Sequence, residues 1–130
     1  MISPSLAGPA AALTGDWRTP AGATVRIEPC GPAPCGRLID FKPLPGRTLQ
    51  SQRDERNRDF AKRTRKVLGL TVLWRVERNN EGWRARVYDP RRGFGADATL
   101  TLDRPGRLKV KGCVKVLFRV CEQEVWRRVR

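Results

Sequence analysis

A polar block in the middle of the chain carries the residue types best suited to binding a ligand. Positions 53–66 read RDERNRDFAKRTRK, with seven Lys or Arg against three acids. Arginine binds carboxylate or phosphate in a bidentate way, which suits a lid or mouth loop that presents charged groups to a ligand. The alternative is structural, because the same groups can bond to one another and to backbone and so hold a long loop in place. The candidate residues are Asp54, Asn57, Asp59, Arg63 and Arg65.

Four further candidates lie in the second half of the chain. Trp83 is in phase with aliphatic neighbours, which favours a core position over stacking on a ligand. Tyr88 and Asp89 mark the end of a strand and a turn, with a hydrogen-bond anchor at a barrel mouth as the alternative. Trp126 is out of phase with nearby valines, so we expect it at a barrel end, in a cation–π contact with Arg128.

The chain contains no histidine, which bears directly on catalysis. Histidine is the usual general base near neutral pH, the partner of serine and cysteine nucleophiles, and the commonest metal ligand. Nothing in the sequence places Asp54 and Asp59 across a cleft as glycoside hydrolysis requires. Residues 93–95, GFG, are not followed by a helix and do not predict a phosphate loop. We therefore expect no enzyme activity, no cofactor and no metal site.

The four cysteines, Cys30, Cys35, Cys113 and Cys121, favour two disulfides in an oxidising compartment. Their spacing favours local pairing, Cys30 with Cys35 and Cys113 with Cys121, among the three possible connectivities. Free thiols and a zinc site are the alternatives, although neither pair has the C-x-x-C spacing of common zinc modules.

The charge is strongly positive, with 27 Lys plus Arg against 13 Asp plus Glu and a net charge of +14. Such a field attracts polyanions, including nucleic acid and the anionic components of a bacterial envelope. Specific nucleic-acid binding is not expected, because no recognised module is present and aromatic residues do not interleave with the basic block. No apolar stretch in the sequence is long enough for a membrane-spanning helix.

Apolar and polar residues alternate with period two over most of the chain, which predicts half-buried strands. Turn signals recur at 79–82, 89–93 and 103–106. The pattern predicts an all-β fold, a small antiparallel up-and-down barrel of about eight strands with one long basic loop or short helix. We expect a flexible leader over residues 1–14 and a single barrel domain over 15–130.

The expected faces of the strands follow from the same alternation. Ile39 and Phe41 should share a face, whereas Thr24 should lie opposite the inward residues of its strand. The expected inward residues are Val25 and Ile27; Leu68, Leu70, Val72, Trp74 and Val76; Trp83, Ala85 and Val87; Ala96, Ala98, Leu100 and Leu102; Leu108 and Val110; and Val125 and Val129.

Several motifs in order resemble a family of small exported bacterial proteins. Gly15-Asp16-Trp17 resembles an opening G-x-W. The middle block is similar to D-x-x-N-P-D-x-x-x-R-x-R-P-x-x-G-L, with Arg58 and Lys66 in place of its two prolines. The closing G-C and C-x-x-Q-x-W-x-R resemble Gly112-Cys113 and the segment from Cys121 to Arg128. The family is Domain of Unknown Function 2147, and the resemblance covers about residues 15–129.

The resemblance implies export to the periplasm and a lipocalin-like, or calycin-like, barrel, and it implies no reaction. We therefore expect a periplasmic or secreted, non-enzymatic domain that binds a small or lipid-like ligand in the barrel. The alternative is a barrel filled by side chains that works through its basic face, binding anionic envelope components or other polyanions.

Overall fold

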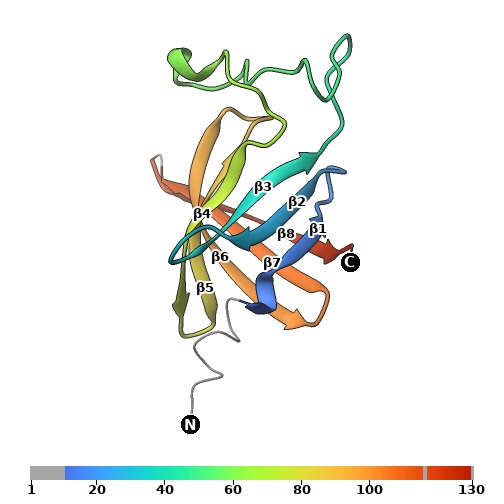
Figure 1. Ribbon diagram of the computed structural model, residues 1–130. Coiled ribbons are helices and arrows are strands. Elements are labelled where there is room, and N and C mark those ends of the chain that lie inside the picture. The colour runs from blue at the N-terminus through green and yellow to red at the C-terminus, as the bar shows by residue number, and fades with distance from the viewer. Residues whose placement is uncertain (1–10, 116, 130) are drawn as a thin grey trace.

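The computed structural model describes residues 11–115 and 117–129 and forms a closed eight-stranded antiparallel barrel (Figure 1). The first ten residues of the expected leader lie outside the described part of the chain. The strands are β1 (Gly15–Arg18), β2 (Thr24–Pro29), β3 (Pro34–Asp40), β4 (Thr71–Asn79), β5 (Gly82–Asp89), β6 (Phe94–Arg104), β7 (Arg107–Lys115) and β8 (Arg119–Arg128). One short 3-10 helix, η1 (Phe60–Lys62), lies in the long β3–β4 connection.

Each strand pairs with the next one along the chain, and β8 returns to pair with β1. The predicted up-and-down barrel is therefore confirmed. Since successive strands alternate in direction, the β1–β2, β3–β4, β5–β6 and β7–β8 connections all lie at one end, which we call the mouth. Figure 1 shows the long β3–β4 loop extending above this end. We call the opposite end the floor.

Most of the predicted inward residues form the core. Alternation places them on the inner face of strands whose outer face meets solvent. The confirmed buried residues are Val25, Ile27, Val72, Val76, Trp83, Ala85, Ala98, Leu100, Leu108 and Val110. The predicted helical turn in the basic block is also confirmed as η1, whose N-cap Asp59 accepts a hydrogen bond from the backbone N–H of Ala61.

The predicted phase of β4 is wrong at Trp74, which is half-buried outside the core, whereas its neighbour Leu73 is fully buried. A β-bulge explains the difference. Arg75 has φ 55°, and the register shifts between Trp74 and Glu77. The extra residue reverses the alternation, so that Leu73 and Val76 both face inward.

Two other faces also differ from the prediction. Thr24 is buried rather than exposed, because the register shifts between Thr24 and Val25. Gly36 and Leu38 are the buried residues of β3, and Ile39 does not share the face of Phe41, because the strand ends at Asp40 before Phe41 is reached.

The predicted inward positions of Val125 and Val129 are wrong as well. Trp126 is buried, and Val129 is 44% exposed. Glu122 and Glu124 share the inward face of Trp126 by strand alternation. The carboxylates of Glu122 and Glu124 therefore line the mouth of the barrel, where arginines of the β5–β6 turn pair with them.

Both disulfides pair as the spacing predicts, which confirms local connectivity. Cys30–Cys35 closes the β2–β3 connection at the floor. Cys113–Cys121 joins directly opposed residues of β7 and β8. The described residues contain no helix long and apolar enough to cross a membrane.

The floor is closed by Leu13, just before β1, and by Trp17 within β1. Leu13 and Trp17 are both fully buried, and the Trp17 indole N–H donates to the Leu13 carbonyl at 2.8 Å. The Arg128 guanidinium lies 4.3 Å from the centre of the Trp17 ring and donates to the carbonyls of Ala12 and Thr14. The predicted contact of Arg128 with Trp126 is therefore wrong, because Arg128 stacks on Trp17 across the β1–β8 closure.

Candidate functional site

A cavity of about 500 Å³ opens at the mouth of the barrel. The β1–β2, β3–β4 and β5–β6 connections contribute to its lining together with the mouth ends of β7 and β8, so it is bounded by the barrel wall on one side and by the long loop on the other. Its apolar wall includes Val25, Leu38, Phe41, Val87, Ala96 and Val110. A concave, mostly apolar space with a few polar groups is typical of a small-molecule site.

Small residues on β6 and β7 leave this space open. Ala96 and Gly112 both line the cavity. A Cβ added at Gly112 would lie 3.8 Å from Val87 Cγ2 and 3.9 Å from Ala96 Cβ, which is ordinary contact. The lumen therefore has room for larger side chains at this position than the chain provides.

Strand β8 places two carboxylates on the lumen wall. In the β7–β8 register Glu122 is opposite Gly112, and Glu124 is opposite Val110. The sequence analysis missed both residues. The signal lay in the cysteines, since pairing of Cys113 with Cys121 fixes this register and puts the even-numbered residues of β8 inward.

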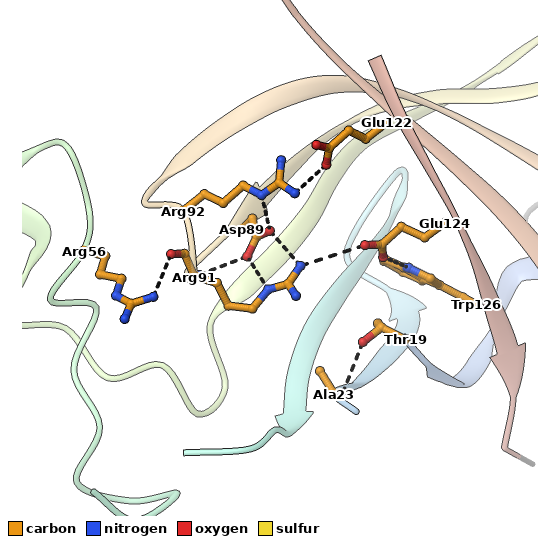
Figure 2. Close-up of polar contacts among 9 residues, drawn as sticks. All are labelled: Thr19, Ala23, Arg56, Asp89, Arg91, Arg92, Glu122, Glu124 and Trp126. Carbon is orange, nitrogen blue, oxygen red and sulfur yellow. Dashed lines mark hydrogen bonds and ion pairs between the residues drawn. The ribbon is translucent and has the colours of Figure 1, made fainter. Parts of the chain in front are cut away.

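Arginines from the β5–β6 turn neutralise these carboxylates across the mouth (Figure 2). Arg92 Nη2 lies 2.5 Å from Glu122 Oε1. Arg91 binds Asp89 through two hydrogen bonds of 3.1 and 2.9 Å, and its Nη2 lies 3.9 Å from Glu124 Oε2. We call these five residues, Asp89, Arg91, Arg92, Glu122 and Glu124, the mouth cluster.

The mouth cluster affects protonation and hydrogen bonding in the lumen. The hydrogen bond to Asp89 raises the pKa of Arg91, and the hydrogen bond to Glu122 raises the pKa of Arg92, so both stay charged. The Trp126 indole N–H donates to Glu124 Oε1 at 2.8 Å. Among the described residues, no donor lies within hydrogen-bond distance of Glu124 Oε2, which lines the cavity as an acceptor.

The predicted block in the long loop forms a second network, centred on Asp54, whose side chain is inaccessible to solvent. Its carboxylate accepts hydrogen bonds from the Tyr88 hydroxyl at 2.6 Å, from Asn57 Nδ2 at 2.8 Å and from Arg65 Nε at 3.0 Å. The Arg65 guanidinium also lies 5.3 Å from the centre of the Tyr88 ring. Asp54 thereby joins two distant parts of the loop to strand β5.

The remaining predicted loop residues extend this network. Arg63 Nε donates to the Asn57 carbonyl at 2.8 Å, and the backbone N–H of Asp59 donates to Asn57 Oδ1 at 2.7 Å. None of the five block residues is among those that line the cavity in the described structure, whereas their neighbours Glu55 and Arg56 are. These hydrogen bonds match the structural role considered for the block, in which its residues bond to one another and hold the long loop on the barrel.

Gly93 ties this loop to the turn that carries the mouth cluster. Its carbonyl accepts a hydrogen bond from the Arg58 N–H at 2.8 Å, and Arg56 Nη1 donates to the Arg91 carbonyl at 3.1 Å. Gly93 has φ 81°, and a Cβ at this position would collide with the Arg56 carbonyl oxygen. Glycine alone tolerates both the positive φ and the close approach of the Arg56 carbonyl.

The other predicted site residues are divided between core and cavity. Trp83 is buried in the core and is not among the cavity-lining residues described. Tyr88, Asp89 and Trp126 line the cavity. Asp89 also accepts hydrogen bonds from the backbone N–H and the side chain of Arg91, as expected of a turn residue.

Residues 15–128 match the model of a family described as "Uncharacterized protein conserved in bacteria (DUF2147)". The chain belongs to DUF2147. No curated protein matches the sequence significantly. A solved structure, protein HP1028 from the human pathogen Helicobacter pylori, is described as belonging to the lipocalin family. It matches with a TM-score of 0.74 at 14% identity, covering 91% of this chain and 83% of that chain. The predicted DUF2147 resemblance and lipocalin-like fold are both confirmed.

The Asp54 network should give this DUF2147 chain a characteristic loss of stability in alkali. Burial, followed by the hydrogen bond to Asp54, raises the pKa of Tyr88 well above its ordinary value of 10.0. Above that value the unfolded chain loses the phenolic proton while the folded chain keeps it, so stability falls as pH rises. Below pH 10.0 the phenol is protonated in both the folded and the unfolded chain, so Tyr88 does not make the free energy of unfolding depend on pH.

We expect urea unfolding from about pH 8 to about pH 11 to show this fall in the wild type, with up to about 1.4 kcal/mol per pH unit from this group. The Tyr88→Phe variant should be less stable near neutrality by about 2 kcal/mol and should lack that component of the slope. Parallel stability curves for the two proteins would contradict this role for Tyr88.

Proposed function

We propose that this chain is an exported, non-enzymatic carrier that holds a small, largely apolar or lipid-like molecule in its barrel, in the periplasm or outside the cell. The observation that supports this proposal is the cavity of about 500 Å³, open at the mouth and walled mainly by aliphatic and aromatic side chains. Burial of an apolar molecule there is favoured by about 25 cal/mol for each Å² of apolar surface removed from water.

The mouth cluster suggests how such a ligand would be oriented. Its apolar body would contact Val25, Leu38 and Val110, deep in the cavity. A hydroxyl or amine at its other end would donate to Glu124 Oε2, which lies 3.9 Å from Arg91 and is too far away for a direct hydrogen bond. The ligand class best matched is therefore an amphiphile with one hydrogen-bond donor near its polar end.

Two features support the non-enzymatic part of the proposal and the location. The sequence has no histidine, and the mouth carboxylates Asp89 and Glu122 are bonded to arginines instead of being set apart as an acid and a base. The two disulfides suit an oxidising compartment such as the periplasm. The alternative of a filled barrel is disfavoured by the cavity itself.

Filling the lumen should abolish ligand binding without unfolding the barrel. Gly112→Leu and Ala96→Leu each place a larger side chain in the cavity. We expect each variant to bind the neutral fluorescent probe N-phenyl-1-naphthylamine at least about tenfold more weakly than the wild type, a loss of about 1.4 kcal/mol. Titration of the probe, alongside native mass spectrometry of protein taken from a bacterial periplasm, measures both added and co-purified ligand.

Thr99→Leu is the matched control, because Thr99 is exposed on the same strand as Ala96. It should bind the probe as the wild type does. Wild-type protein that carries no adduct and binds no apolar probe would overturn the proposal, as would equal binding by the lumen variants and the control.

A further inference from the structure

The tip of the β7–β8 hairpin exposes large apolar side chains. Leu117 is 98% exposed and Phe118 is 69% exposed. Lys115 and Arg119 flank them and are also exposed. Adjacent large apolar residues on a surface are costly in water and commonly mark an interaction site.

A second exposed aromatic lies in the basic part of the long loop. Phe60, the first residue of η1, is 78% exposed. Arg63 lies 5.0 Å from the centre of its ring, and Lys62 follows it in the same helix. Phe60 therefore repeats the composition of the hairpin tip, with an apolar side chain set among cations.

Both features lie at the same end of the barrel. The β3–β4 and β7–β8 connections belong to the mouth because the strands run up and down in order. Figure 1 shows the short coil of η1 above the barrel and the β7–β8 tip at the upper left of the barrel. Both features are therefore presented at the end of the barrel that a partner docking there would face.

The cations around these apolar residues have no acidic partner. In the described structure several surface arginines are paired with carboxylates, for example Arg26 with Asp16 and Arg84 with Glu77. By contrast, no salt bridge within the described ranges involves the cations at the tip and near η1. These are Arg58, Lys62, Arg63, Lys115 and Arg119.

We propose that the mouth end docks on an anionic phospholipid surface, with Leu117, Phe118 and Phe60 entering the interface and the surrounding cations contacting lipid phosphates. Apolar side chains combined with basic residues bind membrane interfaces through hydrophobic burial and attraction to anionic lipid together. A soluble polyanion would account for the cations but not for exposed Leu117 and Phe118. The net charge of +14 adds attraction to the same surface.

Co-sedimentation with vesicles tests this docking on the full chain with its disulfides oxidised. We expect binding to mixed phosphatidylglycerol and phosphatidylcholine vesicles that weakens as salt rises, and at least tenfold weaker binding to phosphatidylcholine alone. The double variant Leu117→Ser, Phe118→Ser should lower the partition coefficient by about tenfold or more. The double variant Lys115→Glu, Arg119→Glu should lower it similarly and reduce the salt dependence.

Val129→Ser is the matched control, because Val129 is 44% exposed at the floor. It should bind vesicles like the wild type. Thermal unfolding of all variants at the wild-type midpoint would confirm that the substitutions act at the surface.

Three outcomes would overturn the proposal. Vesicle binding that is unchanged when Leu117 and Phe118 are replaced, with equal affinity for heparin, would identify a general polyanion surface. Self-association of the wild type that is lost in the same variant would identify a contact between copies of the chain. Equal binding to neutral and anionic vesicles would remove the role of the cations.

Discussion

Replacement of Asp54 by alanine is expected to release the long β3–β4 loop while leaving the barrel folded. The carboxylate is inaccessible to solvent and accepts hydrogen bonds from Tyr88, Asn57 and Arg65. Its loss leaves these donors without their acceptor, which is the costly way to break a buried network. Because the Arg65 side chain is 37% exposed and can be rehydrated, we expect a loss of about 3 kcal/mol, at the lower end for buried ion pairs.

Hydrogen exchange measured by mass spectrometry distinguishes this local effect from global unfolding. Amides of the loop whose hydrogen bonds close the network, including those of Asp54 and Val67, should exchange much faster in Asp54→Ala, whereas those of β6 and β7 should not. Asp97→Ala is the control, since this carboxylate is 82% exposed and among the described residues pairs only with Arg86. Equal protection of the loop in both variants would show that Asp54 does not anchor it.

Trp17→Ala is expected to destabilise the whole barrel. The indole is fully buried at the floor, donates to the Leu13 carbonyl and lies beneath the Arg128 guanidinium. Truncation removes core packing, frees the turn before β1 and leaves Arg128 without its aromatic partner at the β1–β8 closure. We expect a loss of about 3–5 kcal/mol in urea unfolding.

Trp74→Ala provides a comparison for Trp17→Ala with the same change of side chain. Trp74 is half-buried and lies outside the core cluster, so its truncation should cost much less. Similar losses for the two variants would contradict the assignment of Trp17 as the residue that closes the floor.

The barrel was predictable because its signals are local. Period-two alternation, turn sequences such as 103–106 and closely spaced cysteines each act over a few residues, and together they specify a meander. The spacing likewise favoured the pairing of Cys113 with Cys121, which the structure confirms. These features determine which strands are neighbours, and closure of β8 on β1 follows.

Strand phase was less predictable, because it depends on backbone irregularities that the residue types do not reveal. Arg75 adopts a positive φ, which is uncommon for residues other than glycine. The residue type therefore did not predict the β-bulge that turns Trp74 outward. The inward carboxylates of β8 depend on partners from another strand connection. Glu122 is 59% exposed at the mouth, where it pairs with Arg92 of the β5–β6 turn.

The candidate site was partly predictable for the same reason. The loop block was identified from residue types, and its internal bonds, such as Asn57 to Asp54, span few positions. Tyr88 and Asp54 were both candidates, but their bond joins residues 34 positions apart and needed the fold to reveal it. The mouth cluster arises only when β5 and β8 are placed around one lumen.

The contact at Gly93 has a consequence for how this family can diverge. A side chain there would strike the Arg56 carbonyl, so the turn residue and the path of the long loop cannot change independently. Homologues with another residue at this position should have a shortened or displaced loop, and hence a wider opening. In an alignment of homologues, the residue at position 93 should then covary with the length of the β3–β4 loop, and with it the access to the lumen should vary.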